Sequence, residues 1–191
     1  SQADHLQILF TRKLMFQKEA NAIALFPGGF GTHDEGFEIL TLAQTGKSAP
    51  QPIVRLQAPG CDYWDDWSAF IVKQLLKRRL INEEDLSLFK VVNSAEAAVE
   101  EIASFYRRYH SIRFVGRLMA MRLTSSISEE HLEHIQARFS DLLSEGRFEL
   151  RTALEEELDE PAIASLPRLV FPFNRRSAGR LRQLIDYLNR L

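Results

Sequence analysis

The chain has 191 residues, with 24 Lys and Arg against 26 Asp and Glu and a formal charge of −2. That balance offers no general attraction to nucleic acid or to acidic membranes, so we expect neither as a partner. Hydrophobic residues make up 45% of the chain and charged residues 26%, which excludes wholesale disorder. A single cysteine, no apolar run of the roughly 20 residues that cross a bilayer, and no signal peptide predict a cytoplasmic protein.

Two modules are indicated by a change in the cations near residue 110. Residues 1–110 carry Lys and Arg, whereas every cation after residue 110 is Arg. In the first module, apolar spacing predicts, in chain order, a helix over 5–19, a strand over 22–26, a helix over 32–43, a strand over 52–56, a helix over 64–80, a strand over 88–92 and a helix over 94–109 capped by Ser94. Strands separated by helices imply a parallel sheet and the α/β class.

The second module, residues 111–191, has a different pattern. It predicts a strand over 113–123, a helix over 128–143, strands over 147–153 and 169–173, and a closing helix over 179–191. The order β-α-β-β-α indicates a small α+β appendage with an antiparallel sheet. We expect the acidic run at 155–160 to be a solvated loop.

One segment combines a strand, glycines and a helix start: Pro27-Gly28-Gly29-Phe30-Gly31-Thr32-His33-Asp34-Glu35. Glycines let the backbone approach a ligand closely, and a helix N-terminus presents unpaired amides and a positive dipole end. In parallel sheets, ligands bind at the carboxyl ends of the strands. The segment therefore predicts an anion site that suits phosphate.

Two common nucleotide-binding motifs are excluded for this segment, and a purely structural role remains an alternative. The spacing fits neither a dinucleotide fingerprint, because Asp34 stands where a third glycine is needed, nor a Walker loop, because Gly31 and Gly36 lack a following Lys-Ser/Thr. Thr32 and Glu35 also fit a capping box, in which Glu35 only holds the first turn of a helix.

An ordered set of motifs spans residues 11–92. Arg12-Lys13-Leu14-Met15 precedes the strand over 22–26, the Pro-Gly-Gly-x-Gly-Thr-x-x-Glu turn, and Phe37-Glu38-x-Leu40-Thr41-x-Ala43-Gln44. This set resembles the Lonely Guy family, the cytokinin-activating phosphoribohydrolases long mislabelled as lysine decarboxylases.

The resemblance implies a Rossmann-like fold, a homodimer or higher homo-oligomer, and no cofactor or metal. The implied reaction splits a nucleoside 5′-monophosphate, AMP or a cytokinin nucleotide, into free base and ribose 5-phosphate. Carried over by position, Arg12 and Glu35 are the catalytic pair. The substrate-binding positions are Lys13, Gly28, Gly29, Phe30, Gly31, Thr32, His33, Asp34 and Thr41. Asp34 departs from the Glu often found there and keeps the carboxylate on a shorter arm.

These residue types suit the reaction. Breaking an N-glycosidic bond develops positive charge on the ribose, which a carboxylate such as Glu35 can stabilise while it helps to deprotonate water. The guanidinium of Arg12 can orient phosphate or ribose oxygens. A binding module that holds a nucleotide without cleaving it is the alternative, and a structural fragment is a third. Lysine decarboxylation is not favoured, because no lysine has a convincing pyridoxal-binding context.

Two further expectations concern the ends of the chain. Members of that family begin with an earlier βα region, so we expect residues 1–110 to be the C-terminal portion of a Rossmann-like nucleotide-binding domain. The native polypeptide would then be longer, or another chain would supply the missing part. Near the other end, a helix start is surrounded by Arg175, Arg176, Arg180 and Arg182. These arginines are surface cations, partners of the acidic run at 155–160, or groups that bind a phosphorylated ligand.

Overall fold

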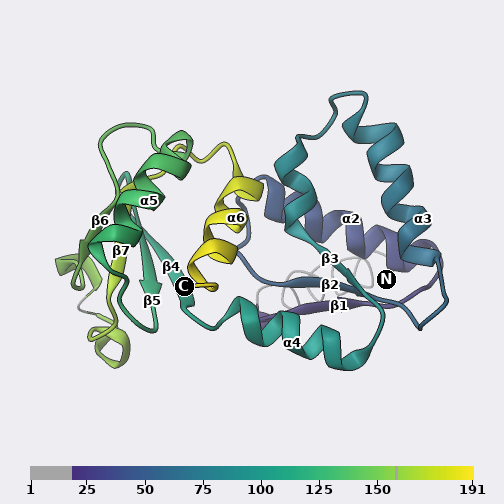
Figure 1. The fold of residues 1–191 in the computed structure, drawn as a ribbon, viewed down its shortest axis with the longest axis horizontal. Coiled ribbons are helices and arrows are strands. Elements are labelled where there is room, and N and C mark those ends of the chain that lie inside the picture. The colour runs from purple at the N-terminus through teal and green to yellow at the C-terminus, as the bar shows by residue number, and fades with distance from the viewer. Residues whose placement is uncertain (1–18, 158) are drawn as a thin grey trace, which may run out of the picture.

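The computed structural model describes residues 19–157 and 159–191, which form two sheets with helices packed on them (Figure 1). The first sheet is parallel, in the order β1-β2-β3, and consists of β1 (Ile23–Leu25), β2 (Ile53–Leu56) and β3 (Lys90–Val92). The second is antiparallel, in the order β4-β5-β7-β6, and consists of β4 (Tyr109–Val115), β5 (Leu118–Leu123), β6 (Glu149–Arg151) and β7 (Arg168–Pro172). The predicted fold class is confirmed: a helix-flanked parallel sheet and a small antiparallel α+β unit.

Helices cover both faces of the parallel sheet. They are α2 (Phe30–Gln44), α3 (Tyr63–Phe70) and α4 (Ala95–Phe105), with a π-helical turn η1 (Ile71–Leu76) after α3 and a 3₁₀ turn η2 (Glu83–Leu88) before β3. In Figure 1, α2 and α3 lie on one side of the sheet and α4 on the other. Ile23, Ile53, Trp64 and Trp67 belong to the buried core beneath α2 and α3. Ser94 caps α4 as predicted, accepting a hydrogen bond of 3.1 Å from the Ala97 amide.

The segment predicted as one strand over 113–123 is a hairpin, so that prediction was wrong. β4 and β5 pair antiparallel as far as Val115 and Leu118, which leaves a two-residue turn of Gly116 and Arg117. Gly116 has φ +57, a left-handed conformation that glycine adopts without a Cβ penalty and that matches the twist of a tight hairpin. The second module therefore has the order β-β-α-β-β-α, with helices α5 (Glu129–Phe139) and α6 (Ala178–Leu188).

The two faces of the antiparallel sheet carry different kinds of buried side chain, apolar on one face and charged on the other. Alternate residues of β5 and β7, such as Met121 and Leu169, join the core beneath α5 and α6. On the other face, Arg122 lies directly opposite Arg168 in the register of β5 and β7. Like charges directly across a sheet repel, so this pair needs a shared anion.

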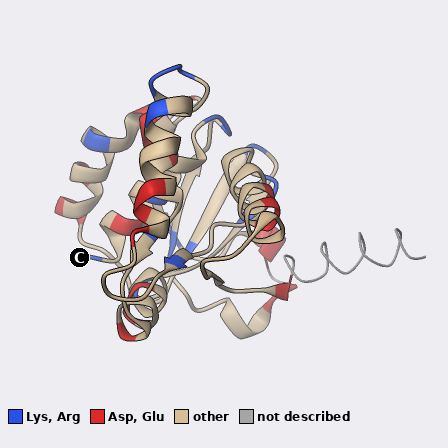
Figure 2. Cartoon of the chain, turned by 90° about the vertical axis from the view of Figure 1, so that its right-hand side faces the viewer, with Lys and Arg blue, Asp and Glu red and all other residues tan. Residues whose placement is uncertain are grey.

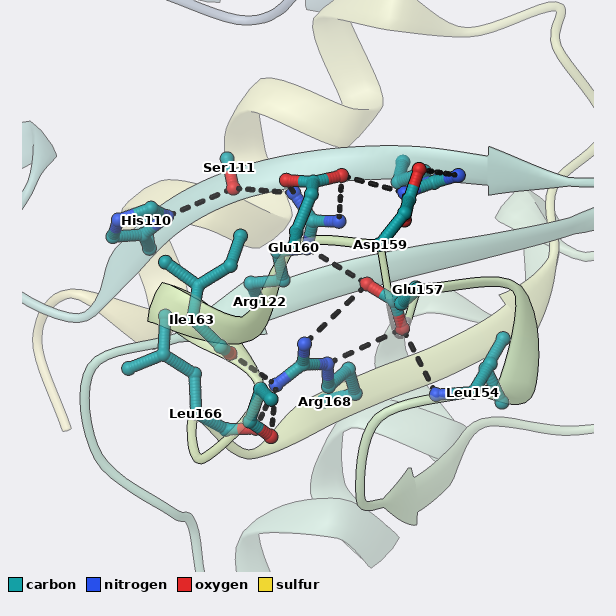
Figure 3. Close-up of polar contacts among 12 residues, drawn as sticks. His110, Ser111, Arg122, Leu154, Glu157, Asp159, Glu160, Ile163, Leu166 and Arg168 are labelled. Carbon is teal, nitrogen blue, oxygen red and sulfur yellow. Dashed lines mark hydrogen bonds and ion pairs between the residues drawn. The ribbon is translucent and has the colours of Figure 1, made fainter.

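Glu157 supplies that anion. Its carboxylate is fully buried and accepts from Nε of Arg122 at 2.7 Å and from Nε of Arg168 at 3.3 Å (Figure 3). Glu160 pairs with Arg122 at 2.9 Å and with Arg113 at 2.6 Å, and Asp159 also pairs with Arg113. The expectation of a solvated acidic run agrees with the exposed Glu155, Glu156 and Asp159. It was wrong for Glu157, which Arg122 and Arg168 hold in the interior.

Helix α6 connects the two modules. Leu181, Leu184 and Leu188 are part of the core of the second module. On another side of α6, Nη2 of Arg182 donates to Glu101 of α4 at 2.5 Å, and Gly179 lies so close to η2 that a Cβ would overlap the Glu84 carbonyl. Figure 1 shows α6 between the two sheets.

Three further expectations from the sequence concern the N-terminal helix, the module boundary and the membrane and charge properties of the chain. The helix over 5–19 lies outside the described residues, except for its last residue, which is helical. The module boundary at residue 110 stays a prediction. Within residues 19–157 and 159–191, no helix has the length and hydrophobicity to span a membrane, and both signs of charge occur on the face that Figure 2 shows.

Candidate functional site

The glycine-rich turn lies where the sequence predicted it, between the carboxyl end of β1 and the N-terminus of α2. β1 ends at Leu25 and α2 begins at Phe30, with Gly29 as its N-cap. The amides of Thr32 and His33 both donate to the Gly29 carbonyl, at 3.1 and 3.3 Å, which closes the first turn. The earlier amides of the helix precede these bonds and mark its positive end, so the turn is suited to an anion.

The capping-box interpretation of Thr32 and Glu35 was wrong. Gly29, not Thr32, is the N-cap, and no side chain caps the helix. The Thr32 amide already bonds to Gly29, so it is not the group that Glu35 would hold in a capping box. Glu35 lies in the second turn of α2, half-buried. Its carboxylate is therefore not explained as the capping partner of Thr32.

The first glycine is required by close packing. A Cβ at Gly28 would overlap Oγ1 of Thr32, whereas a Cβ at Gly29 or Gly31 would meet nothing within 4 Å. The three glycines therefore have different roles. Gly28 permits the chain to turn tightly against the helix, while Gly29 and Gly31 leave open space in front of the first turn.

Tyr63, which the sequence analysis did not single out, fastens this turn. Its hydroxyl donates to the Gly28 carbonyl and lies 2.7 Å from Nε2 of His33. The hydroxyl has a single hydrogen, and this hydrogen is already in the hydrogen bond to the Gly28 carbonyl. Nε2 of His33 is therefore the donor in its hydrogen bond to the Tyr63 oxygen. The rings of His33 and Tyr63 also stack, with centroids 5.8 Å apart. The bond fixes both the turn and the orientation of the imidazole.

Gln57 holds α3, and with it Tyr63, at the carboxyl edge of the sheet. The side chain of Gln57 follows β2 and is 2% exposed. Its Oε1 accepts from the Trp64 amide at 2.7 Å, and its Nε2 donates to Asp65 at 2.7 Å and to Asn93 at 3.2 Å. Asn93 follows β3, so one amide joins the ends of two neighbouring strands to the helix that carries Tyr63. The position of Tyr63 just after the second strand and Pro59-Gly60 was the signal in the sequence.

Only some of the predicted substrate-binding residues lie together at the glycine turn. Phe30 is 95% exposed beside the glycines, and Asp34 is exposed in the next turn. Thr41 lies nine residues after Thr32, roughly 13 Å along the helix axis, and its hydroxyl donates to the Phe37 carbonyl at 2.7 Å. Thr41 is thus not brought to the glycine turn by α2. Arg12 and Lys13 lie outside the described residues.

A second unpredicted feature is the buried cation of Arg55 on β2. Its guanidinium carbon lies 3.1 Å from the centroid of the Trp67 ring, 4.7 Å from that of Phe89 and 4.9 Å from that of Trp64. Its Nε and Nη1 are buried without a hydrogen-bond partner. Burial lowers the pKa of Arg55 to about 9. The three rings partly replace water around the charge through cation–π attraction.

Three of the arginines near the start of α6 have separate partners. Arg180 pairs with Asp141 at 2.9 Å, and Arg182 pairs with Asp186 at 2.8 Å. The guanidinium of Arg175 lies 4.3 Å from the centroid of the Phe114 ring. Arg180 and Arg182 therefore pair with acids outside the run at 155–160, and Arg175 contacts an aromatic ring.

A buried parallel strand, a glycine turn and an open helix N-terminus define an α/β protein of the Rossmann-like class with a candidate anion site. The chain belongs to the family described as possible lysine decarboxylase, whose model matches residues 2–102. That match includes β1, the glycine turn, α2 and the strands β2 and β3. Comparison with curated proteins gave no match.

Proposed function

We propose that this protein is a phosphoribohydrolase of the Lonely Guy type, which hydrolyses the N-glycosidic bond of a nucleoside 5′-monophosphate. The observation that carries the proposal is the glycine turn at the start of α2, with Glu35 one turn further along a helix whose N-terminus is not capped by a side chain. The family match supports it at a coarser level, because it covers the whole of this turn.

In this proposal the phosphate binds at the first turn of α2. Its charge is stabilised by the helix dipole and by amides that point out of the turn. Tyr63 and Gln57 keep that turn in place, so little ordering is needed when the nucleotide binds. In the same proposal, His33, which Tyr63 orients, contacts the ribose or the base.

The carboxylate of Glu35 then acts on the sugar. As the bond from C1′ to the base nitrogen breaks, the ribose ring gains positive charge, which the carboxylate stabilises. Water adds to C1′ as its proton passes to the carboxylate, and that proton is then delivered to the nitrogen of the leaving base, which returns Glu35 to its ionised form. Arg12 is proposed to hold the phosphate or ribose oxygens against this centre.

Lysine decarboxylation is less consistent with the described residues. A lysine that forms a Schiff base is usually desolvated in a pocket, where its amine loses its proton more easily. Lys47, Lys73, Lys77 and Lys90, the lysines of the part of the chain that the structure describes, are all exposed.

The test is release of free base from a panel of nucleoside 5′-monophosphates by the longest native chain, measured by chromatography. Glu35→Gln should reduce turnover by about a hundredfold or more, as loss of a charge-stabilising catalytic group does. Glu100→Gln, an exposed glutamate of α4, is the matched control and should behave as wild type. Wild-type turnover in Glu35→Gln would refute the catalytic role. Binding of nucleotide with no base released by wild type would favour the binding module.

A further inference from the structure

A cavity of about 400 Å³ lies between the two modules, away from the glycine turn. One wall is the segment between α2 and β2, and the other comes from β4, β5, the residues after β7 and the start of α6. The residues at the start of β2, including Gln51 and Ile53, line it. The glycine turn follows the opposite, carboxyl end of the neighbouring strand β1. The cavity is therefore a separate site at the other edge of the parallel sheet.

The walls are apolar over most of their length. They are contributed by both modules, with Ile53 and Leu88 on one side and Ile112, Met119 and Phe173 on the other. A volume of this size, lined largely by aliphatic and aromatic groups, is typical of a pocket for a small organic molecule.

Two buried polar atoms of the lining residues lack partners. Oε1 of Gln51 is a buried acceptor without a donor, and Nη1 of Arg182 is a buried donor without an acceptor. Arg182 is 3% exposed, with its Nε bound to Asp186 and its Nη2 to Glu101. An unpartnered buried polar group costs roughly 1–3 kcal/mol, so a ligand that bonded to these atoms would recover free energy.

The charges at the cavity have one sign. Lys47, Arg175 and Arg182 line it, and none of the described residues that line it is acidic. Glu101 and Asp186 already pair with Arg182, so the charge available to a ligand comes from Lys47 and Arg175. Ala178, the first residue of α6, also lines it, so the positive end of the helix dipole faces the same space. Arg175 already stacks on Phe114, another lining residue, and thus lies against the apolar wall.

From these observations we infer that the cavity is a binding site for a small organic anion with an apolar body. The apolar body lies between Ile53 and Met119. The anionic group lies toward Lys47 and Arg175. Nη1 of Arg182 and Oε1 of Gln51 serve as a hydrogen-bond donor and an acceptor for the ligand. Because both modules supply walls, such a ligand binds them to each other. The inference does not depend on the proposed hydrolysis.

A fluorescent probe of this chemistry tests the site directly. 1-Anilinonaphthalene-8-sulfonate has an aromatic body, a sulfonate and one N–H, and N-phenyl-1-naphthylamine is the same molecule without the sulfonate. We expect the full chain to bind the sulfonate probe at one site, about tenfold more tightly than the neutral probe, as one charge-assisted hydrogen bond provides. Equal affinity for the two probes would overturn the inference.

Variants locate the binding. Lys47→Gln with Arg175→Gln should remove most of the preference for the sulfonate, whereas Arg176→Gln, a neighbouring exposed arginine that does not line the cavity, should keep it. Ala178→Trp should fill the cavity and abolish binding of both probes. If Ala178→Trp, folded by circular dichroism, bound the sulfonate probe as wild type does, the site would lie elsewhere and the inference would fail. The charge variants decide the question if Ala178→Trp does not fold.

Discussion

The hydroxyl of Tyr63 lies 2.7 Å from Nε2 of His33, and it donates its own proton to the carbonyl of Gly28. One phenol from the helix after β2 thus bridges the two sides of the turn that follows β1. β1 and β2 are neighbours in the sheet, so the residues that follow them lie close together. The order of the strands therefore determines the geometry of the candidate site.

Replacing Tyr63 with Phe should loosen the turn while keeping the ring stack. A single neutral hydrogen bond contributes about 1 kcal/mol, so we expect the KM for a nucleoside monophosphate to rise several-fold, with the melting temperature lowered by only a few degrees. Tyr106→Phe is the matched control, because its hydroxyl donates to the Asn21 carbonyl at 2.6 Å, in another part of the fold. Steady-state kinetics should separate the two variants. An equal KM in both would contradict the role of Tyr63.

Substituting Gly179 with Ala should destabilise the contact between the modules. The added Cβ would overlap the backbone carbonyl of Glu84, and backbone cannot move aside as a flexible side chain can. We expect a loss of about 1–3 kcal/mol, the usual effect of overpacking, measured by urea denaturation. Ser177→Ala, one residue before α6, is the control, since the Ser177 side chain makes no capping hydrogen bond. If Gly179→Ala were as stable as wild type, α6 would not pack on η2 as described.

The ion pairs around Glu157 predict a specific loss of stability in acid. Burial raises the pKa of Glu157, but the Leu154 amide and the guanidinium groups of Arg122 and Arg168 outweigh it, so the pKa lies below its usual value. The hydrogen bond from Arg122 likewise lowers the pKa of Glu160. A carboxyl group with a lowered pKa in the folded state stabilises the fold above its unfolded pKa, about 4.3. This stabilisation is lost as the pH falls through the folded value.

Glu157→Gln tests that account. The substitution leaves Arg122 opposite Arg168 with no shared anion, which should cost about 3–5 kcal/mol at pH 7. Because the variant has lost one of the groups that titrate, its stability should also fall less steeply below about pH 4.3 than that of wild type. Denaturation measured from pH 7 down to pH 3 shows both effects. Glu156→Gln, an exposed neighbour, should match wild type at every pH.

For Arg55, in contrast to Glu157, removal of the buried charge should not reduce the stability of the fold. Its Nε and Nη1 are buried without hydrogen bonds, and burial is what lowers its pKa to about 9. Met fills a similar volume without a charge, so Arg55→Met should be as stable as wild type or more stable at pH 7. Arg55→Ala should lose roughly 2–5 kcal/mol, because it leaves a cavity beneath Trp67. Thermal denaturation distinguishes packing from charge. Equal losses in both variants would show that the cation itself stabilises the fold.

Short-range features of this protein are predictable from the sequence. The buried strand before Pro27, the helix start within the glycine turn, and the Ser94 cap depend on residues within a few positions of one another. The local sequence is sufficient to predict these features, because caps and turns use hydrogen bonds that span three or four residues. The hairpin at Gly116 was missed because an apolar run continues through it on both sides, which periodicity alone does not divide.

Only the tertiary structure decided which distant residues meet. Tyr63 reaches Gly28 across 35 residues, and Glu157 reaches Arg122 across 35 residues, because strand order and register bring them together. Nothing near Glu157 in sequence indicates that this acid, unlike the exposed Glu155 and Glu156, is buried. The sequence by itself therefore determined the chemistry of the glycine turn. The packing of two sheets against α6 determined the ion pairs and the cavity between the modules, because those contacts exist only after the chain has folded.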